Sequence, residues 1–374
     1  MSMNRRTFLK GCAAGGAVLA MGGAGGMAFL DSAAFGALPE GKDLQRILLS
    51  PHQQGGVFVN LEPAPVLADN SNFVVSLARW LMLKRERPKP QKPLPHVRVD
   101  VRNLEENALV WLGHSSFFLR LAGKNILIDP VFSDYGSPFF FSNRAFAGTT
   151  FVTADDMPRI DLLLITHDHW DHLDYPTVMA LKDRIGCVVC GLGTGAHFRR
   201  WGFAGKSILE GDWGESLDFG ELKIHFITSR HFAGRSLKNH DRALWCGFVL
   251  EVPGFRLLHS GDGGYGSHFK ALGERFGAVD LAIMDSGQYN KNWPTVHMFP
   301  HEAVQAALDV GARHFMPAHI GRFCLSQHSW DEPFVLAAQK ASEKNLPLFT
   351  PLMGKVIPLT RELPAQPHWW EGLE

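Results

Sequence analysis

The stretch His167-Asp168-His169-Trp170-Asp171-His172 directly follows an apolar run at Asp161–Ile165 and precedes a helical pattern that begins at Pro176. A continuous apolar run of this length is typical of a strand buried on both faces. In open α/β sheets, the residues at the carboxyl ends of the strands surround a cleft. His167 and His169 can share one metal ion because alternate residues of an extended backbone point the same way. Asp171 and His172 lie one turn later and can serve a second ion.

The ligand types in this stretch indicate which metal to expect. Imidazoles and carboxylates without a thiolate favour zinc, with iron or manganese as alternatives. The chain has 18 histidines, and a single one in a loop is more often an ordinary polar residue than a ligand. Four ligand-type residues within six positions at a strand end are rarely accidental. The sequence therefore predicts a centre that binds two metal ions.

Other apolar runs also end in ligand-capable residues. These are His231 after Leu222–Thr228, Asp262 after Phe255–His259, and His319 after Arg313–Pro317. Because strand ends at one edge of a sheet face a common cleft, we expect these residues to join the same centre. The predicted metal ligands are His167, His169, Asp171, His172, His231, Asp262 and His319.

From Leu109 onward, short apolar runs alternate with helical patterns, which predicts an α/β domain with its sheets inside and its helices outside. The expected strands are Leu109–Leu112, Phe117–Leu121, Ile126–Ile128, Asp161–Ile165, Gly186–Gly191, Leu222–Thr228, Leu244–Val252, Phe255–His259, Val279–Met284 and Arg313–Pro317. The expected helices are Pro176–Arg184, Ser267–Phe276, Pro300–Val310 and Trp330–Lys344.

Residues 1–37 have the pattern of an export signal. Arg5-Arg6 and a following Thr-Phe-Leu-Lys precede the uncharged stretch Gly11–Leu30, and small residues occur at Ser32–Ala37. Paired arginines in this context are typical of a twin-arginine signal, which implies a periplasmic or exported protein. A retained inner-membrane anchor is the alternative. Seven of the 20 uncharged residues are glycine, which disfavours a spanning helix.

We expect residues 38–106 to form an irregular, proline-rich N-terminal strap and residues 107–374 to form the catalytic domain. Within the strap, Asn72–Lys84 has apolar side chains at helical spacing, so it either packs on the core or contacts lipid. Cys187 and Cys190 fall on opposite faces of one expected strand, which favours buried thiols over a redox pair.

The charge balance argues against one class of partner. The chain has 37 basic and 37 acidic side chains, so its formal net charge is zero. Such a chain has no overall field that attracts a polyanion. We therefore expect no nucleic-acid partner.

The order of metal ligands resembles that of the metallo-β-lactamase superfamily. Flanking motifs resemble the branch that contains N-acyl-phosphatidylethanolamine-hydrolysing phospholipase D. These motifs are Trp111-Leu-Gly-His114, Asp129-Pro130, His231-Phe-Ala-Gly-Arg235, the run Leu-Trp-Cys-Gly-Phe-Val-Leu-Glu251, and His297-Met-Phe-Pro-His-Glu-Ala303. The resemblance covers roughly residues 70 to 350.

This resemblance implies an αββα four-layer sandwich built from two ββα halves, with the metals at one edge of the sheets. It also implies a division of ligands: His167, His169 and His231 hold one zinc, Asp171, His172 and His319 hold the other, and Asp262 bridges them. The sequence departs from the branch at Phe299, at His301 and in the Gly-Gly pair after Asp262. These departures concern the substrate more than the metals.

The leading functional expectation is a zinc-dependent phosphodiesterase that acts on a lipid-like phosphodiester. A shared water, acidified by two ions, would provide the attacking hydroxide. The expected catalytic residues are Asp171, Asp262 and His297. For His297 the expected role is to bind substrate oxygen or protonate the leaving group, with helix capping or packing as the alternative. Two other functions stay open: a lactone or ester hydrolase on the same centre, and a metal-binding protein without hydrolytic turnover.

Three further groups of residues are expected around the centre. His114 is expected to buttress the site, and Asp129 to orient a ligand histidine through its second nitrogen. Pro138–Phe141, with Phe146 and Phe151, forms an aromatic cluster. This cluster either lines a channel for acyl chains, faces a membrane, or packs as an ordinary loop.

Overall fold

The computed structural model describes residues 28–65 and 86–373, apart from positions 237 and 365. Most of the expected export signal, and the whole of the expected helix at Asn72–Lys84, lie outside the described residues. In the described part of the chain, no helix has both the length and the apolar composition needed to cross a bilayer.

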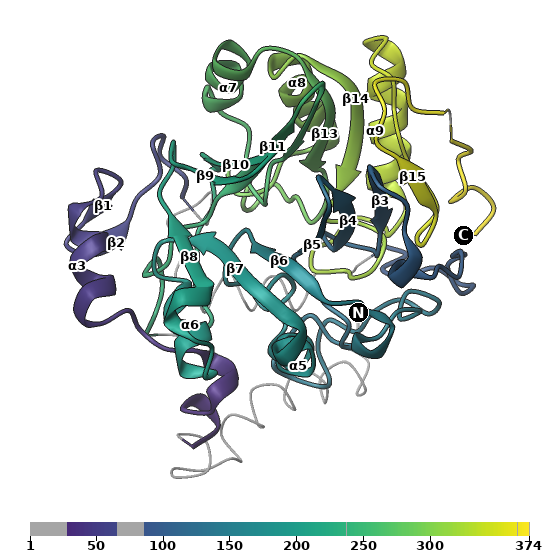
Figure 1. Ribbon diagram of the computed structural model, residues 1–374. Coiled ribbons are helices and arrows are strands. Elements are labelled where there is room, and N and C mark those ends of the chain that lie inside the picture. Colours follow the sequence, from purple (N-terminus) through teal and green to yellow (C-terminus); the bar gives the residue numbers. More distant parts are fainter. Residues whose placement is uncertain (1–27, 66–85, 237, 365, 374) are drawn as a thin grey trace, which may run out of the picture.

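Two mixed β-sheets lie at the centre of the molecule (Figure 1). The first sheet has the order β15-β3-β4-β5-β6-β7-β8 and the second has the order β14-β13-β12-β11-β10-β9. The strands of the first sheet are β3 (Ala108–Trp111), β4 (Phe117–Leu121), β5 (Lys124–Ile128), β6 (Ile160–Ile165), β7 (Ile185–Gly191), β8 (Ile208–Gly211) and β15 (Val356–Pro358). Those of the second are β9 (Ser216–Phe219), β10 (Leu222–Ile227), β11 (Gly247–Val252), β12 (Phe255–His259), β13 (Val279–Asp285) and β14 (Ala312–Ala318).

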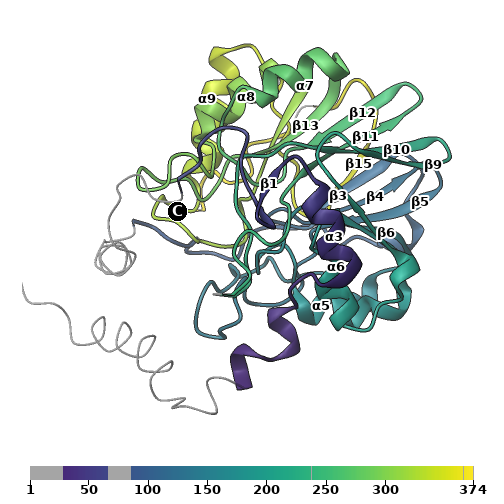
Figure 2. The same ribbon diagram turned by 90° about the vertical axis from the view of Figure 1, so that its left-hand side faces the viewer.

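Helices cover the outer face of each sheet (Figures 1 and 2). The first sheet packs against α5 (Tyr175–Leu181) and α6 (Gly195–Arg200), and the second packs against α7 (His268–Phe276), α8 (Pro300–Asp309) and α9 (Glu332–Glu343). Three apolar clusters follow: one between the sheets and one beneath each helical layer. This arrangement confirms the expected αββα sandwich.

The burial of β6 shows why its sequence is apolar at nearly every position. Leu162 and Leu164 join the cluster between the sheets, whereas Leu163 and Ile165 join the cluster beneath α5 and α6. Side chains of a strand alternate between its two faces. Because both faces are buried here, no alternation of polar and apolar residues remains.

The N-terminal segment is more ordered than the sequence indicated. It contains a helix, α3 (Gly41–Leu49), and a short hairpin of β1 (Gln53–Gln54) and β2 (Val57–Phe58). Ile47 and Phe58 are buried in the cluster between the sheets, while Leu49 at the end of the helix is exposed. Residues 38–65 therefore pack against the catalytic domain through these buried side chains.

The expected strand at Leu244–Val252 begins later than the sequence indicated. Only Gly247–Val252 pairs as β11. The backbone N–H of Leu244 donates to Leu192 O at 2.7 Å, and that of Cys246 donates to Thr166 O at 2.9 Å. This segment runs from the second sheet to the strand ends of the first and is buried there. Its residues are therefore apolar although they do not pair as a β-strand.

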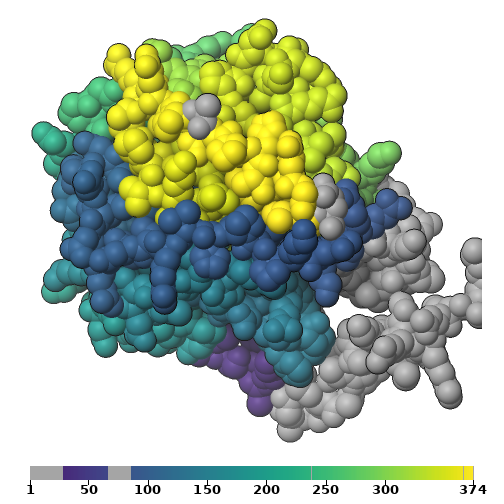
Figure 3. Space-filling view, turned by 90° about the vertical axis from the view of Figure 1, so that its right-hand side faces the viewer, coloured from purple at the N-terminus to yellow at the C-terminus, as the bar shows by residue number. Residues whose placement is uncertain are grey.

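The C-terminal segment closes one edge of the first sheet. β15 pairs with β3 in antiparallel register, and Val97 N donates to Met353 O at 2.8 Å. Figure 3 shows this segment in yellow alongside the blue segment that precedes β3. The two segments therefore cover an edge that would otherwise expose unpaired backbone groups.

We expect Leu164→Ala to destabilise the protein by about 2–5 kcal/mol, because the side chain is fully buried between the sheets and its removal leaves a cavity. Leu49→Ala is the matched control, since Leu49 is 85% exposed. Urea unfolding of both variants, without added metal, measures the difference. Equal free energies of unfolding for the two variants would contradict the described core.

Candidate metal centre

The centre lies where strands of both sheets end at the same edge of the sandwich. The loop His167–His172 follows β6, His231 follows β10, Asp262 follows β12, and His319 follows β14. The structure brings all seven predicted ligands together at this edge. All of them are buried except His169, which is partly exposed.

Three histidines form the first cluster. His167 Nε2 lies 2.9 Å from His169 Nδ1, and His231 Nε2 lies 3.2 Å from the same His169 nitrogen. Burial is the main reason why the pKa values of His167 and His231 lie well below the usual histidine range and why that of His169 is also lowered. These rings are therefore neutral near pH 7, and each keeps a nitrogen lone pair.

Hydrogen bonds fix which nitrogen of two of these rings carries the proton. The Thr166 hydroxyl donates to Asp129 Oδ2 at 2.6 Å, so its oxygen is left to accept from His167 Nδ1 at 3.0 Å. His231 Nδ1 donates to Val296 O at 2.8 Å, since a carbonyl oxygen can only accept. Both rings therefore direct an unprotonated Nε2 into the cluster.

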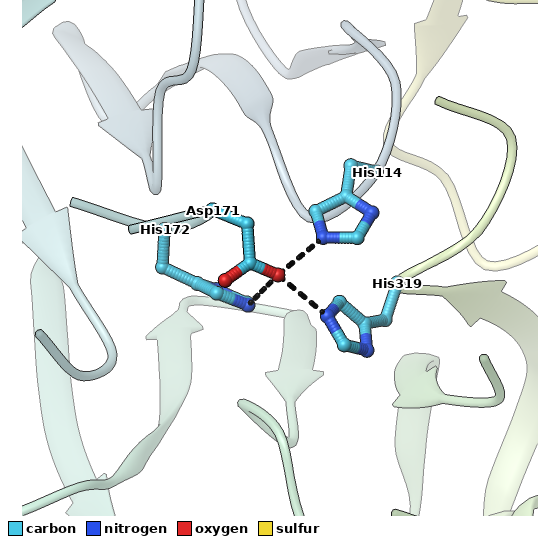
Figure 4. A group of neighbouring side chains, drawn as sticks. All are labelled: His114, Asp171, His172 and His319. Atoms are coloured by element: carbon cyan, nitrogen blue, oxygen red, sulfur yellow. Dashed lines mark hydrogen bonds and ion pairs between the residues drawn. The ribbon is translucent and has the colours of Figure 1, made fainter. Parts of the chain in front are cut away.

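Asp171 is the centre of the second cluster (Figure 4). Its Oδ2 lies 2.9 Å from His114 Nε2, 3.0 Å from His319 Nε2 and 3.7 Å from His172 Nε2. His172 is held from behind, because its Nδ1 donates to Asp129 Oδ2 at 2.8 Å. The expected roles of Asp129 as the residue that orients a histidine, and of His114 as a buttress, agree with these contacts.

Asp262 lies between the two clusters. Its Oδ2 is 3.0 Å from His172 Nε2, 3.1 Å from His319 Nε2 and 3.9 Å from His167 Nε2. Burial alone would lower the pKa of His319, but the carboxylates of Asp262 and Asp171 outweigh it and raise that pKa to about 10. One carboxylate thus faces histidines of both clusters, which is the position a bridging ligand requires.

The donor set fits a pair of divalent cations. In the first cluster, the free lone pairs of His167 Nε2 and His231 Nε2 both face His169 Nδ1, at 2.9 and 3.2 Å. A single N–H on that nitrogen can serve only one of them, so at least one buried nitrogen is left unpaired in this cluster. In the second cluster, His172 Nε2 and His319 Nε2 both lie against one oxygen, Asp262 Oδ2, at 3.0 and 3.1 Å. Buried polar atoms are normally paired, so these nitrogens are arranged for a cation. The four described cysteines are not in these groups.

A further residue, Asp285, was missed by the sequence analysis. It ends β13, and its Oδ2 accepts from His297 Nδ1 at 2.8 Å and from Gly263 N at 3.0 Å. The signal was available, since Asp285 follows an apolar run just as Asp262 does. With Nδ1 held by Asp285, His297 leaves its other ring nitrogen free beside the metal ligands.

The centre opens into a cavity of about 250 Å³. His297 lines this cavity together with metal-ligand candidates and apolar side chains. The lining residues are His169, Asp171, Phe232, Asp262, Gln288, Trp293, Val296, His297, His319 and Leu325. A substrate in this cavity would contact both His297 and the candidate ligands.

Four residues around the centre adopt a backbone conformation that is rare for residues other than glycine. His114 has φ 54°, Asp129 has φ 41°, Gln288 has φ 56° and His319 has φ 62°. Such left-handed positions cost free energy and persist only where surrounding contacts hold them. Two of these residues, His319 and Gln288, line the cavity directly.

The expected aromatic cluster divides into two parts. Phe146 is buried, and Phe151 packs against His96 with ring centroids 4.8 Å apart, so these two are ordinary packing residues. Phe140 and Phe141 are exposed, at 77% and 50%. Gly136 lies a few residues before them on the same loop. A Cβ at Gly136 would lie 3.1 Å from Asp171 Cβ, so this loop passes close to the centre.

Two of the three departures from the branch pattern, His301 and Phe299, lie outside the donor groups. His301 is exposed on α8. Phe299 precedes that helix and packs against Tyr289, with ring centroids 4.9 Å apart. Neither side chain belongs to a group of possible metal ligands among the described residues.

Comparison with known proteins identifies the family. A family model described as a β-lactamase superfamily domain matches residues 124–320, more than half of the chain. An uncharacterized protein of Mycobacterium tuberculosis is 34% identical over 328 residues, which cover 86% of this chain and 87% of the relative. The N-acyl-phosphatidylethanolamine-hydrolyzing phospholipase D 1 of Caenorhabditis elegans is 30% identical over 226 residues, which cover 57% of this chain and 63% of the relative.

A solved structure shares the fold. The metallo hydrolase Igni18 of Ignicoccus hospitalis superposes with a TM-score of 0.51 at 19% identity, covering 67% of this chain and 96% of that one. The fold, the family model and the relative that spans most of the chain agree. The chain therefore belongs to the β-lactamase superfamily of metal-dependent hydrolases.

Proposed function

We propose that this hydrolase is a zinc-dependent phosphodiesterase that acts on a lipid-like phosphodiester. The observation that carries the proposal is the convergence of seven imidazole and carboxylate ligands on one buried edge, beside a cavity that holds an additional histidine. The relatives named as N-acyl-phosphatidylethanolamine-hydrolyzing phospholipases D, from Caenorhabditis elegans and Saccharomyces cerevisiae, support the choice of a phosphodiester.

In this proposal the two clusters divide the ligands as their contacts suggest. His167, His169 and His231 hold one ion, and Asp171, His172 and His319 hold the other, with Asp262 in contact with both sets. Bound divalent ions would supply Lewis acidity, which lowers the pKa of a water and offsets charge on phosphoryl oxygens. The absence of thiolates among the described donors favours zinc over softer metals.

His297 is proposed to protonate the leaving group. The alcohol released from a phosphodiester is a poor leaving group as an alkoxide, so its departure requires a proton. Asp285 orients the ring through Nδ1, which leaves Nε2 to act toward the cavity. The ring also lies close to two ligand histidines, His231 and His319, with centroid distances of 5.0 and 4.9 Å.

The walls of the cavity favour a substrate with an apolar part. Phe232, Trp293, Val296 and Leu325 supply most of its apolar lining. The exposed Phe140 and Phe141 lie on the loop that passes beside Asp171, and they are proposed to contact acyl chains or the surface of a lipid aggregate.

A lactone or ester is the second candidate substrate class. The part of the chain that the structure describes places no lysine or arginine in the lining of this cavity. A neutral lactone or ester could therefore bind in this cavity without leaving a lysine or arginine charge unpaired. Parallel assays with bis(p-nitrophenyl) phosphate, p-nitrophenyl esters and lactones separate the two classes. Hydrolysis of esters or lactones alone would reject the phosphodiesterase, and metal uptake without any turnover would favour a metal-binding protein.

We expect His169→Ala to abolish metal-dependent cleavage of bis(p-nitrophenyl) phosphate and to lower the zinc content, because the variant loses one of the three imidazoles of the first cluster. His301→Ala is the matched control, since His301 is exposed and outside the donor groups. Zinc content by plasma mass spectrometry and circular dichroism accompany the assay. Full activity and normal zinc content in His169→Ala would reject the assignment of this ligand.

We expect His297→Gln to lower kcat by roughly 10²–10⁴-fold on an alkyl phosphodiester and far less on bis(p-nitrophenyl) phosphate. A p-nitrophenolate departs without help, whereas an alkoxide needs the proton that His297 is proposed to supply. Measured zinc content provides the control for an intact centre. Equal losses on both substrates would assign His297 to substrate binding instead.

A further inference from the structure

Residues Asp31–Ala37, which we name the clasp, run across the outside of the metal loop His167–Leu173. Trp201 Nε1 donates to Ala33 O at 2.7 Å, and Arg200 Nη1 donates to Gly36 O at 2.6 Å. In Figure 2 the purple segment that contains the clasp passes beside α6 and connects to α3. The sequence placed these residues within an export signal, whereas the structure packs them on the catalytic domain.

A hydrogen-bonded path leads from the clasp to the metal loop through His197. Ala37 N donates to His197 Nδ1 at 3.0 Å, and a nitrogen that accepts from a backbone amide carries no proton. The proton of the neutral ring is therefore on Nε2, which donates to Asp168 Oδ2 at 3.1 Å. Asp168 is the residue between the ligand histidines His167 and His169.

Asp168 supports the loop from outside the metal centre. Its side chain is fully buried, and its other oxygen accepts from Gly234 N at 2.7 Å. It belongs to none of the groups of possible metal ligands among the described residues. Its carboxylate therefore points away from the ions that its two neighbours are proposed to bind.

A second path runs through Arg235, whose side chain is almost fully buried. Its guanidinium donates to Ala34 O in the clasp at 3.0 and 3.1 Å. The same group donates to Asp168 O at 2.9 Å and to Leu173 O at 2.6 Å, near the two ends of the metal loop. One side chain thus joins the clasp to both ends of this loop.

Aromatic packing completes the contact. The guanidinium of Arg235 lies 3.9 Å from the ring centroid of Trp170, in the middle of the metal loop. The buried ring of Phe35 meets Trp170 edge-on, with centroids 4.9 Å apart. The clasp therefore contacts the loop directly through the Phe35 ring, and indirectly through Arg235 and His197.

We propose that the clasp is a positioning element of the metal centre, and that it acts on the metal loop through two positioning residues, His197 and Arg235. The clasp fixes the loop that carries His167 and His169, and so sets the direction of their ligand nitrogens. This inference rests on the proposed metal centre but is independent of the substrate. It assigns a role in the folded enzyme to residues that otherwise read as part of a signal.

Gly36 provides a way to disturb the clasp alone. It has φ 73°, and a Cβ at this position would lie 2.0 Å from His197 Nδ1. Gly36→Ala therefore forces the clasp away from His197. Gly41→Ala is the matched control, because Gly41 also has a positive φ of 54° but nothing lies within 4 Å of the position of its Cβ.

The experiment measures zinc affinity and the visible spectrum of the cobalt-substituted protein in the full chain. Loss of a residue that supports a metal ligand typically weakens metal affinity by about 10–100-fold, and we expect this loss, with an altered cobalt spectrum, for Gly36→Ala but not for Gly41→Ala. Unchanged affinity and spectrum in Gly36→Ala would overturn the proposal. If the wild-type chain binds no zinc, the metal centre itself is wrong.

A second pair of variants decides the matter if Gly36→Ala does not fold. His197→Gln retains an N–H that can reach Asp168, whereas His197→Leu fills the space without hydrogen bonds. We expect His197→Gln to recover zinc affinity and the cobalt spectrum, and His197→Leu to lose both. Melting temperatures of the metal-free variants control for general destabilisation. Equal affinities and identical cobalt spectra in the two variants would reject the positioning role.

Discussion

The structure depends on the burial of imidazoles and carboxylates together at one edge of two apolar sheets. Buried polar groups cost free energy unless each is paired. Asp129 shows how the chain meets this constraint, because its two oxygens accept from the backbone and hydroxyl of Thr166 and from His172. Since Thr166 in turn orients His167, one carboxylate outside the donor groups aligns a histidine of each cluster. The orientation of the ligand histidines thus depends on residues, such as Asp129 and Thr166, that contact them from outside the donor groups.

The sandwich supplies the positions from which these residues act. The loops after β6, β10, β12 and β14 all leave the sheets at one edge, so residues as distant in the chain as His167 and His319 meet there. The three apolar clusters hold the strands, and the residues at Leu244–Cys246 join the second sheet to the ends of the first through backbone hydrogen bonds. Movement of the metal loop would therefore disturb contacts on both sheets.

Most of the central strands and all seven candidate ligands could be predicted from the sequence, because an apolar run that ends in a polar residue leaves a clear pattern. The edge strands β8 and β9 could not, since they have four residues each and mixed polarity. Asp285 could have been found by the rule that found Asp262. The clasp could not, because Ala33, Ala34 and Gly36 make their contacts through backbone carbonyls, which leave no trace in the choice of side chains. The tautomers of His167 and His231 likewise depend on partners that only the fold brings near.

The left-handed backbone at His114, Asp129, Gln288 and His319 costs free energy that surrounding contacts must offset. Glycine or asparagine adopts this conformation at lower cost. At Asp129, however, glycine would leave the donors of Thr166 and His172 buried without an acceptor, which costs more than the strain it relieves. Selection for thermal stability alone would therefore retain this aspartate. A copy of this chain that drifts after losing catalysis would keep Asp129, so its presence is a mark of the fold and not of turnover.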